Sequence, residues 1–207
     1  MYIPKLNQET DIKTLQDFMM AHNFAVLINH HDGQLNATHL PFMLDKDRGE
    51  YGTLIGHLAR ANKQWKAFGE DEVMIIFNGP HAYISPTWYE NHPSVPTWNY
   101  ATVHAYGVPQ IIEEQTAVDS ILSDLVKNHE GNRNPEWVMD LPHDLMNTLR
   151  QAIVAIEIPI TKLEGKFKLS QNKTESEQQN VISELLQSRY TDDVATGKLM
   201  KTRLSND

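Results

Sequence analysis

FAVLINHHDGQLNATHLPF, residues 24–42, has the pattern of two β-strands joined by a tight turn. Residues 24–29 are apolar enough for a buried strand, and Asp32-Gly33 is a pair that favours a two-residue hairpin turn. We therefore predict a returning strand over about residues 34–44. Pro41 cannot donate a ladder hydrogen bond, so this second strand is predicted to be an edge strand or to be bulged there.

The rest of the chain alternates further short strands with helices. Apolar residues three to four apart predict helices over residues 11–22 and 116–129, and shorter helices are expected over residues 61–68 and 142–151. Strands are predicted over residues 51–58, 73–78, 81–85, 98–112, 153–159 and 165–169, with Gly79-Pro80 ending the second of them. From residue 175 the pattern becomes helical again. The order predicts an α+β fold on a mainly antiparallel sheet, with a domain of residues 1–174 and a helical C-terminal tail of residues 175–207 packed on it.

Composition excludes several classes of site. The 207 residues contain no cysteine, which removes disulfides, thiolate nucleophiles and cysteine-based metal centres. The net charge of −9 argues against broad, nonspecific DNA binding, although a local basic patch is compatible with it. The start has no leader pattern and the apolar runs are too short to span a bilayer, so a cytoplasmic protein without membrane attachment is expected.

No familiar catalytic or nucleotide-binding motif is present. The sequence lacks G-x-S-x-G, G-x-x-x-x-G-K-[ST], H-E-x-x-H and G-x-G-x-x-G, and we assign no catalytic residue. Five histidines fall on successive predicted strands: His30, His31, His39, His57 and His81. None of them has helical i, i+4 spacing or a carboxylate in a telling position, so hydrogen-bonded histidines at strand ends are favoured over a metal site.

GHLARANKQW, residues 56–65, is the best candidate for an anion site. A predicted strand ends there and a predicted helix begins, and the first backbone N–H groups of a helix suit a phosphate. His57, Arg60, Asn62 and Lys63 add further donors at this junction. The competing interpretation, a capped helix start with solvated Arg and Lys side chains, is favoured by spacing alone.

Two other segments mix donors with strand ends. Thr38-His39-Leu40 precedes Pro41, and backbone groups left free there could face a flat ligand; an edge strand protected from aggregation explains the same pattern. FKLSQNK, residues 167–173, follows one predicted strand and precedes the tail. It either lines a site or forms a polar turn, and the residue types alone favour the turn.

Taken together, several long segments resemble the PaiB-type family, described as FMN-binding negative transcriptional regulators. They are MYIPK at the start, ATHLPF (37–42), GHLARANKQW, IFNGPHAYISPTWY (76–89), VPTWNYATVHAYG (95–107) and FKLSQNK. The resemblance runs from residue 1 to about residue 190. It departs from the family at Leu6-Asn7, where a His-Phe pair is usual.

The resemblance implies a split β-barrel of the FMN-binding type, with peripheral helices, that forms a homodimer with flavin at the subunit interface. Thr38, His39 and Leu40 would then contact the flavin edge. The ribityl phosphate would lie among His57, Arg60, Asn62 and Lys63. Residues from the opposite side or from the partner subunit would complete the site: Trp98, Asn99, Lys168, Ser170 and Gln171.

Three functions are compatible with these expectations. The first is an FMN-binding regulator that alters gene expression directly or through a partner. The second is a flavin-dependent oxidoreductase, or a haem-handling enzyme of the same fold, in which the cofactor supplies the redox chemistry. The third is a binding module that has lost flavin. The resemblance favours the first, although the sequence contains no helix-turn-helix with basic base-reading residues.

Overall fold

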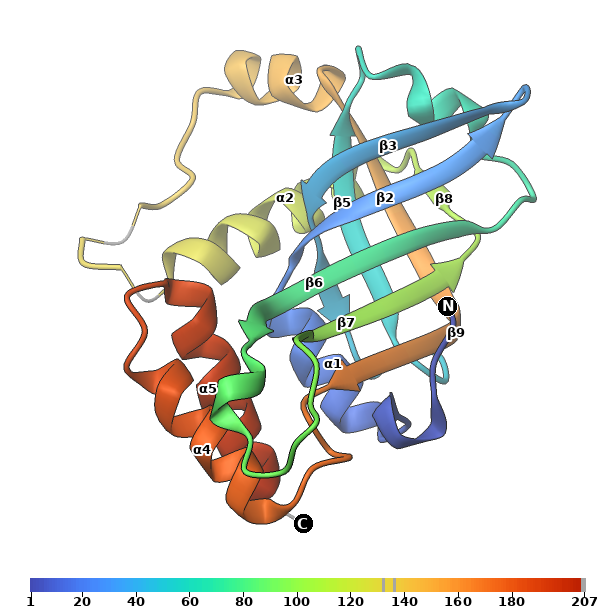
Figure 1. Ribbon diagram of the computed structural model, residues 1–207. Helices are drawn as coiled ribbons and strands as arrows, with labels where there is room; N and C mark the ends of the chain where they lie inside the picture. Colours follow the sequence, from blue (N-terminus) through green and yellow to red (C-terminus); the bar gives the residue numbers. More distant parts are fainter. Residues whose placement is uncertain (132, 136, 206–207) are drawn as a thin grey trace. The chain divides into compact units, whose positions relative to one another are not determined.

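A computed structural model describes residues 1–131, 133–135 and 137–205 (Figure 1). The chain divides into two compact units. The sheet unit comprises Met19–Phe77 and Ala105–Leu163. The tail unit comprises Met1–Phe18, Asn78–His104 and Glu164–Asp207. No helix in the described part of the chain is both long and apolar enough to cross a membrane.

The sheet unit holds most of the strands. Its own elements are β2 (Phe24–His31), β3 (Gln34–Pro41), β4 (Met43–Asp45), β5 (Thr53–Ala59), the 3-10 helix η2 (Lys63–Ala67), β8 (Gln110–Ile112), α2 (Gln115–Glu130) and α3 (His143–Gln151). Parts of β6 (Val73–Ile84), β7 (Thr97–Gly107) and β9 (Ile153–Lys168) complete it, and the strand order is β3-β2-β6-β7-β9-β5-β4 with β8 also on β9. The pairings β2–β3, β2–β6, β4–β5, β5–β9 and β8–β9 are all antiparallel, as predicted.

The predicted hairpin at residues 24–42 is confirmed. β2 and β3 pair from Phe24 with Pro41 through to His31 with Gln34. The turn between them places Asp32 at φ 51° and Gly33 at φ 74°, both left-handed, which is the backbone that a two-residue turn between twisted strands requires. Since β3 ends at Pro41 and lies at the end of the strand order, its edge position agrees with the missing proline donor.

Several element boundaries were predicted wrongly. The strand predicted over residues 34–44 is divided into β3 and β4, and the one over residues 98–112 into β7 and β8. The helix predicted over residues 61–68 is the 3-10 helix η2. Gly79-Pro80 does not end a strand, because β6 continues from Val73 to Ile84. β2 pairs with β6 only at residues 74–76, so Pro80 lies beyond the stretch that β2 uses and its missing N–H removes no bond to that strand. Likewise the two strands predicted over residues 153–159 and 165–169 are one strand, β9.

Helix α2 packs on the sheet unit with the apolar face that its periodicity predicts. Val118, Ile121 and Leu125 are buried and form a cluster with Ala155 of β9. Glu114 caps the first turn, where its carboxylate accepts hydrogen bonds from the backbone N–H groups of Thr116 and Ala117. This packing holds α2 beside β9, and α3 directly precedes β9 in the chain.

The tail unit contains the N-terminus and the C-terminal helices. Its elements are η1 (Lys5–Asn7), β1 (Gln8–Glu9), most of α1 (Ile12–Ala21), η3 (Pro86–Trp88), α4 (Glu175–Leu186) and α5 (Thr191–Leu204), with the remaining parts of β6, β7 and β9. β1 pairs with the end of β9. α4 and α5 pack against each other, as the two red helices of Figure 1. Thr174 and Glu177 form a reciprocal capping box at the start of α4.

Candidate functional site

The junction after β5 is built around a buried glutamine. The side chain of Asn62 accepts a hydrogen bond from the backbone N–H of Gln64 (3.0 Å), which caps η2, and its Nδ2 donates to Thr38 Oγ1 (2.8 Å). The Thr38 hydroxyl donates to Gln64 Oε1. Gln64, only 5 % exposed, in turn donates to Leu27 O and Asn29 Oδ1. The structure thus brings Thr38 and Asn62 together, with their polar groups largely engaged by each other and by Gln64.

The other predicted residues at this junction differ in how available they are. His39 is exposed, and its ring stacks on that of Phe24 with centroids 6.2 Å apart and an interplanar angle of 29°. Leu40 is buried, so only its backbone could contact a ligand. His57 is half-buried; its Nδ1 is buried without a hydrogen-bond partner among the described residues, and burial lowers the pKa of its imidazole. Lys63 is exposed, and it is the lysine among the residues predicted to bind the phosphate.

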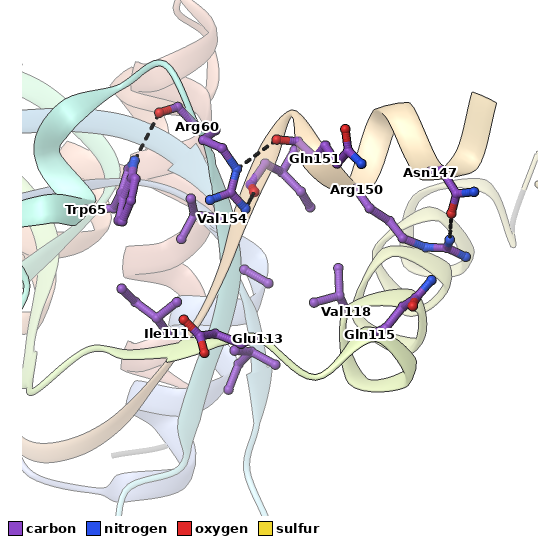
Figure 2. A pocket seen from close by; sticks show the side chains of 13 residues that line it. Arg60, Trp65, Ile111, Glu113, Gln115, Val118, Asn147, Arg150, Gln151 and Val154 are labelled. Atoms are coloured by element: carbon purple, nitrogen blue, oxygen red, sulfur yellow. Dashed lines mark hydrogen bonds between the residues drawn. The ribbon is translucent and has the colours of Figure 1, made fainter. Parts of the chain in front are cut away.

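The Arg60 side chain has different hydrogen-bond partners from the Asn62 side chain. Its Nε donates to Gln151 O (2.7 Å) and its Nη2 to Ile153 O (2.6 Å), at the turn between α3 and β9. Its guanidinium also lies over the ring of Trp65, 5.8 Å from the centroid. Figure 2 shows Arg60 and Trp65 lining a cavity of about 510 Å³, which neither Asn62 nor Lys63 lines.

The predicted residues of the tail unit form a second group. Asn99 is fully buried, and its Nδ2 donates to Ser170 Oγ (2.9 Å). Ser170 has φ 65°, a left-handed conformation that is uncommon for a residue other than glycine. Lys168 donates to Thr97 Oγ1 and Trp98 O, and burial, with a smaller effect of Lys166, lowers the pKa of its ammonium. Asn99, Lys168 and Ser170 line a cavity of about 450 Å³ in this unit.

Trp98 and Gln171 do not line that cavity. Trp98 is 53 % exposed and its ring contacts the rings of His81 and Tyr83. The Gln171 side chain donates to Phe167 O and accepts from the backbone N–H of Leu169, so it stabilises the turn after β9. No cluster of three or more metal-binding side chains occurs in the ranges that the structure covers.

Sequence reasoning missed Gln64, Phe24 and Trp65. An Asn side chain often accepts a hydrogen bond from the backbone N–H two positions later in the chain. This rule, applied to Asn62, could have predicted its bond from the backbone N–H of Gln64. Nothing in the local sequence indicates that the Gln64 side chain is buried, because its partners come from β2 and β3. Phe24 was interpreted only as the start of a strand, yet it is 64 % exposed.

Comparison with known proteins decides the family. Residues 1–162 match the model of the FMN_bind_2 family, described as "Putative FMN-binding domain". The chain belongs to this family. It is also 33 % identical over 205 residues to "Protease synthase and sporulation protein PAI 2" of Bacillus subtilis, covering 99 % of this chain and 98 % of that protein. An uncharacterized protein of Emericella nidulans is 32 % identical and covers 88 % of this chain and 89 % of its own length. The resemblance to the PaiB-type family is confirmed.

Solved structures with a similar backbone confirm the fold class. The flavocytochrome Anf3 from Azotobacter vinelandii superposes with a TM-score of 0.59 at 12 % identity, over 80 % of this chain and 72 % of that one. The FAD and heme binding protein from Mycobacterium smegmatis gives a TM-score of 0.59 at 15 % identity, over 78 % and 73 %. At such low identity the likeness concerns the fold alone, and it confirms the predicted split-barrel type of antiparallel sheet with peripheral helices.

Proposed function

We propose that this protein binds FMN at the β3–β5–η2 junction and acts as a PaiB-like regulator. The match of residues 1–162 to the FMN-binding family carries this proposal, since it spans every element of that junction. The side chains present also suit the cofactor. Two exposed flat rings, His39 and Phe24, offer a surface for a planar ring system, and Lys63 offers an unpaired cation for a phosphate.

His57 strengthens the fit. A buried polar nitrogen without a partner costs free energy, and a bound molecule is one way to satisfy it. Thr38 and Asn62 would act mainly by fixing the shape of the junction, because their polar groups are engaged with Gln64. Bound FMN would supply one- and two-electron redox chemistry, whereas the side chains here bind and orient it.

The original assignment of Arg60 and of the tail-unit residues stays a prediction. Arg60 is committed to two carbonyl groups, so any contribution to the phosphate would come through the remainder of its guanidinium. Trp98, Asn99, Lys168, Ser170 and Gln171 are proposed to complete the flavin site from the opposite side or from the partner subunit. If so, Lys168→Met should weaken FMN binding.

We further propose a homodimer in the cytoplasm. The edge strand β3 exposes Leu35, and β2 exposes Phe24 at the opposite end of the hairpin, where Phe24 pairs with Pro41. β3 lies at the end of the strand order, so its outer edge could pair with a second copy of the chain. A second copy of the chain is the occupant that the flavin proposal calls for. Light scattering on the purified protein gives the mass directly, and a monomer at micromolar concentration would contradict this part.

The regulatory role is drawn from the relative named for protease synthesis and sporulation in Bacillus subtilis. Direct DNA contact has little support on the surface: of the basic residues on α5, Arg203 is paired with Glu9 at 2.7 Å. We therefore favour regulation through a partner or through flavin-dependent change, with direct DNA binding as the alternative. Retardation of promoter fragments at moderate salt would favour direct binding.

Flavin titration tests the cofactor part. Protein stripped of cofactor and mixed with FMN should quench the flavin fluorescence saturably and gain heat stability, because a ligand that binds only the folded state shifts unfolding. FMN that neither binds nor stabilises the protein would contradict the proposal. Bleaching of the bound flavin by NADH or NADPH would instead indicate an oxidoreductase.

A further inference from the structure

The cavity of Figure 2 lies wholly within the sheet unit and shares Arg60 with the predicted phosphate residues, whereas Thr38, Asn62 and Lys63 do not line it. Its walls come from the end of β5, η2, β8, α2, α3 and the start of β9. At about 510 Å³ it falls in the size range of pockets for small molecules. In the view of Figure 2, Arg60 and Trp65 lie at one end, Arg150 and Gln115 at the other, and apolar side chains such as Val154 between them.

Arg60 gives this cavity a positive charge in a fixed position. Two backbone carbonyls hold its guanidinium, and no carboxylate of the described residues pairs with it. Backbone carbonyls orient the group but carry no net charge to balance it. An arginine held in this way, with donors remaining, is suited to a carboxylate or another anion.

The other charges of the cavity limit which anion fits. Arg150 is neutralised by Asp119 through both carboxylate oxygens, and it also donates to Asn147. Glu113 brings a negative charge to the wall. The free positive charge is therefore Arg60 alone, which favours a single carboxylate over a phosphate group that carries up to two charges.

The rest of the wall is apolar. Ile111, Val118 and Val154 line it, and the Trp65 ring lies under the Arg60 guanidinium, fixed by a bond from its Nε1 to Arg60 O (3.0 Å). Apolar surface of this kind stabilises the body of a ligand, while the single charge orients it. We propose that the cavity binds a small monocarboxylate with an apolar, preferably aromatic, body. The proposal does not rest on the flavin proposal, although Arg60 is also one of the residues predicted to surround the FMN phosphate.

The indole N–H of Trp65 provides the readout, because it lies in the cavity. In a 15N-labelled sample saturated with FMN, titration with phenylacetate should shift the Trp65 indole signal saturably, with a Kd of about 1 mM or tighter. The Trp65→Phe variant identifies that signal among the four tryptophans of the chain. Phenylacetamide, which has the same shape without the charge, and inorganic phosphate should each bind at least about tenfold more weakly.

Variants separate this site from the junction. Arg60→Gln should weaken phenylacetate binding at least about tenfold, whereas Lys127→Gln, which removes an exposed cation of α2 outside the cavity, should not. Dispersed signals from the other indoles show whether Arg60→Gln still folds. If it does not, the comparison of phenylacetate with phenylacetamide on the unaltered chain decides.

Three outcomes would overturn the proposal: no saturable shift at about 10 mM phenylacetate, equal affinity for the amide, or a shift that appears only in protein without FMN. The last would mean that the cavity belongs to the flavin. Loss of FMN binding with phenylacetate binding intact would count against the flavin proposal alone.

Discussion

At the scale of single residues, the junction depends on side chains that reach across the sheet. The sequence predicted Thr38 for the flavin edge and Asn62 and Lys63 for the phosphate, and the structure brings Thr38 and Asn62 within hydrogen-bond distance. It could not predict that Gln64 joins them, since the partners of the Gln64 side chain lie 26 to 37 positions away in the chain. Nor could the sequence predict that the Arg60 side chain donates to the carbonyl groups of Gln151 and Ile153, because residues so far apart in the chain meet only in the folded protein.

His57 should make stability depend on pH. Burial lowers the pKa of its imidazole below the ordinary value of 6.5, so the unfolded chain takes up the proton first as the pH falls. The contribution of His57 is fully present above pH 6.5 and is lost as the pH falls toward the folded-state pKa. His22 and His104 share this direction, also through burial.

We therefore expect the free energy of unfolding, measured in urea without FMN, to fall between pH 6.5 and about pH 5. His57→Gln should reduce that slope. His129→Gln, at an exposed position of α2, serves as the control and should leave it unchanged. A slope that is the same for all three proteins would show that His57 is not desolvated.

At the scale of elements, β6 shows where local sequence rules fail. Gly79-Pro80 is a strong turn signal, yet β6 runs through it, and the ring of Phe18 of α1 lies against Gly79. The α-helices and the Asp-Gly hairpin were predicted correctly, since their signals are local, whereas residues 61–68 contain only the 3-10 helix η2. Strand continuity depends on neighbours distant in the sequence, which local propensity does not describe.

Gly79→Ala should destabilise the protein. A Cβ there would lie 2.6 Å from Phe18 Cζ and 3.1 Å from Ala101 O, so the ring or the strand must move. We expect a loss of about 1–3 kcal/mol in the free energy of unfolding, as for other overpacked core positions. Urea unfolding with Gly69→Ala as the control, where a Cβ meets nothing within 4 Å, checks this. Equal stability of the two variants would mean that Phe18 is not packed against Gly79.

At the scale of the whole molecule, the split-barrel type could be predicted from the family resemblance but not from strand counting. The division into residues 1–174 and a tail that packs on them stays a prediction. Within the tail unit, α4 and α5 bury Val181, Leu185 and Met200, and the sulfur of Met200 accepts from Asn99 Nδ2 (3.3 Å). The C-terminal helices therefore complete a core rather than extend from it.

Deleting residues 175–207 should consequently expose this apolar surface and give an aggregated protein. The soluble fraction after expression and the cooperativity of thermal unfolding, both compared with the full chain, measure the effect. A soluble 1–174 fragment that unfolds cooperatively at the same temperature would show that the tail is dispensable.

The affinity of FMN for Lys63→Met tests the central claim most directly. Lys63 and Lys66 are both exposed lysines of the short helix η2, and only Lys63 directly follows the capping Asn62. By quenching of flavin fluorescence, Lys63→Met should bind FMN at least about tenfold more weakly than the unaltered chain, through loss of a charge-assisted contact to the phosphate. Lys66→Met should bind as the unaltered chain does. Equal affinity of all three proteins would contradict a flavin phosphate at this junction.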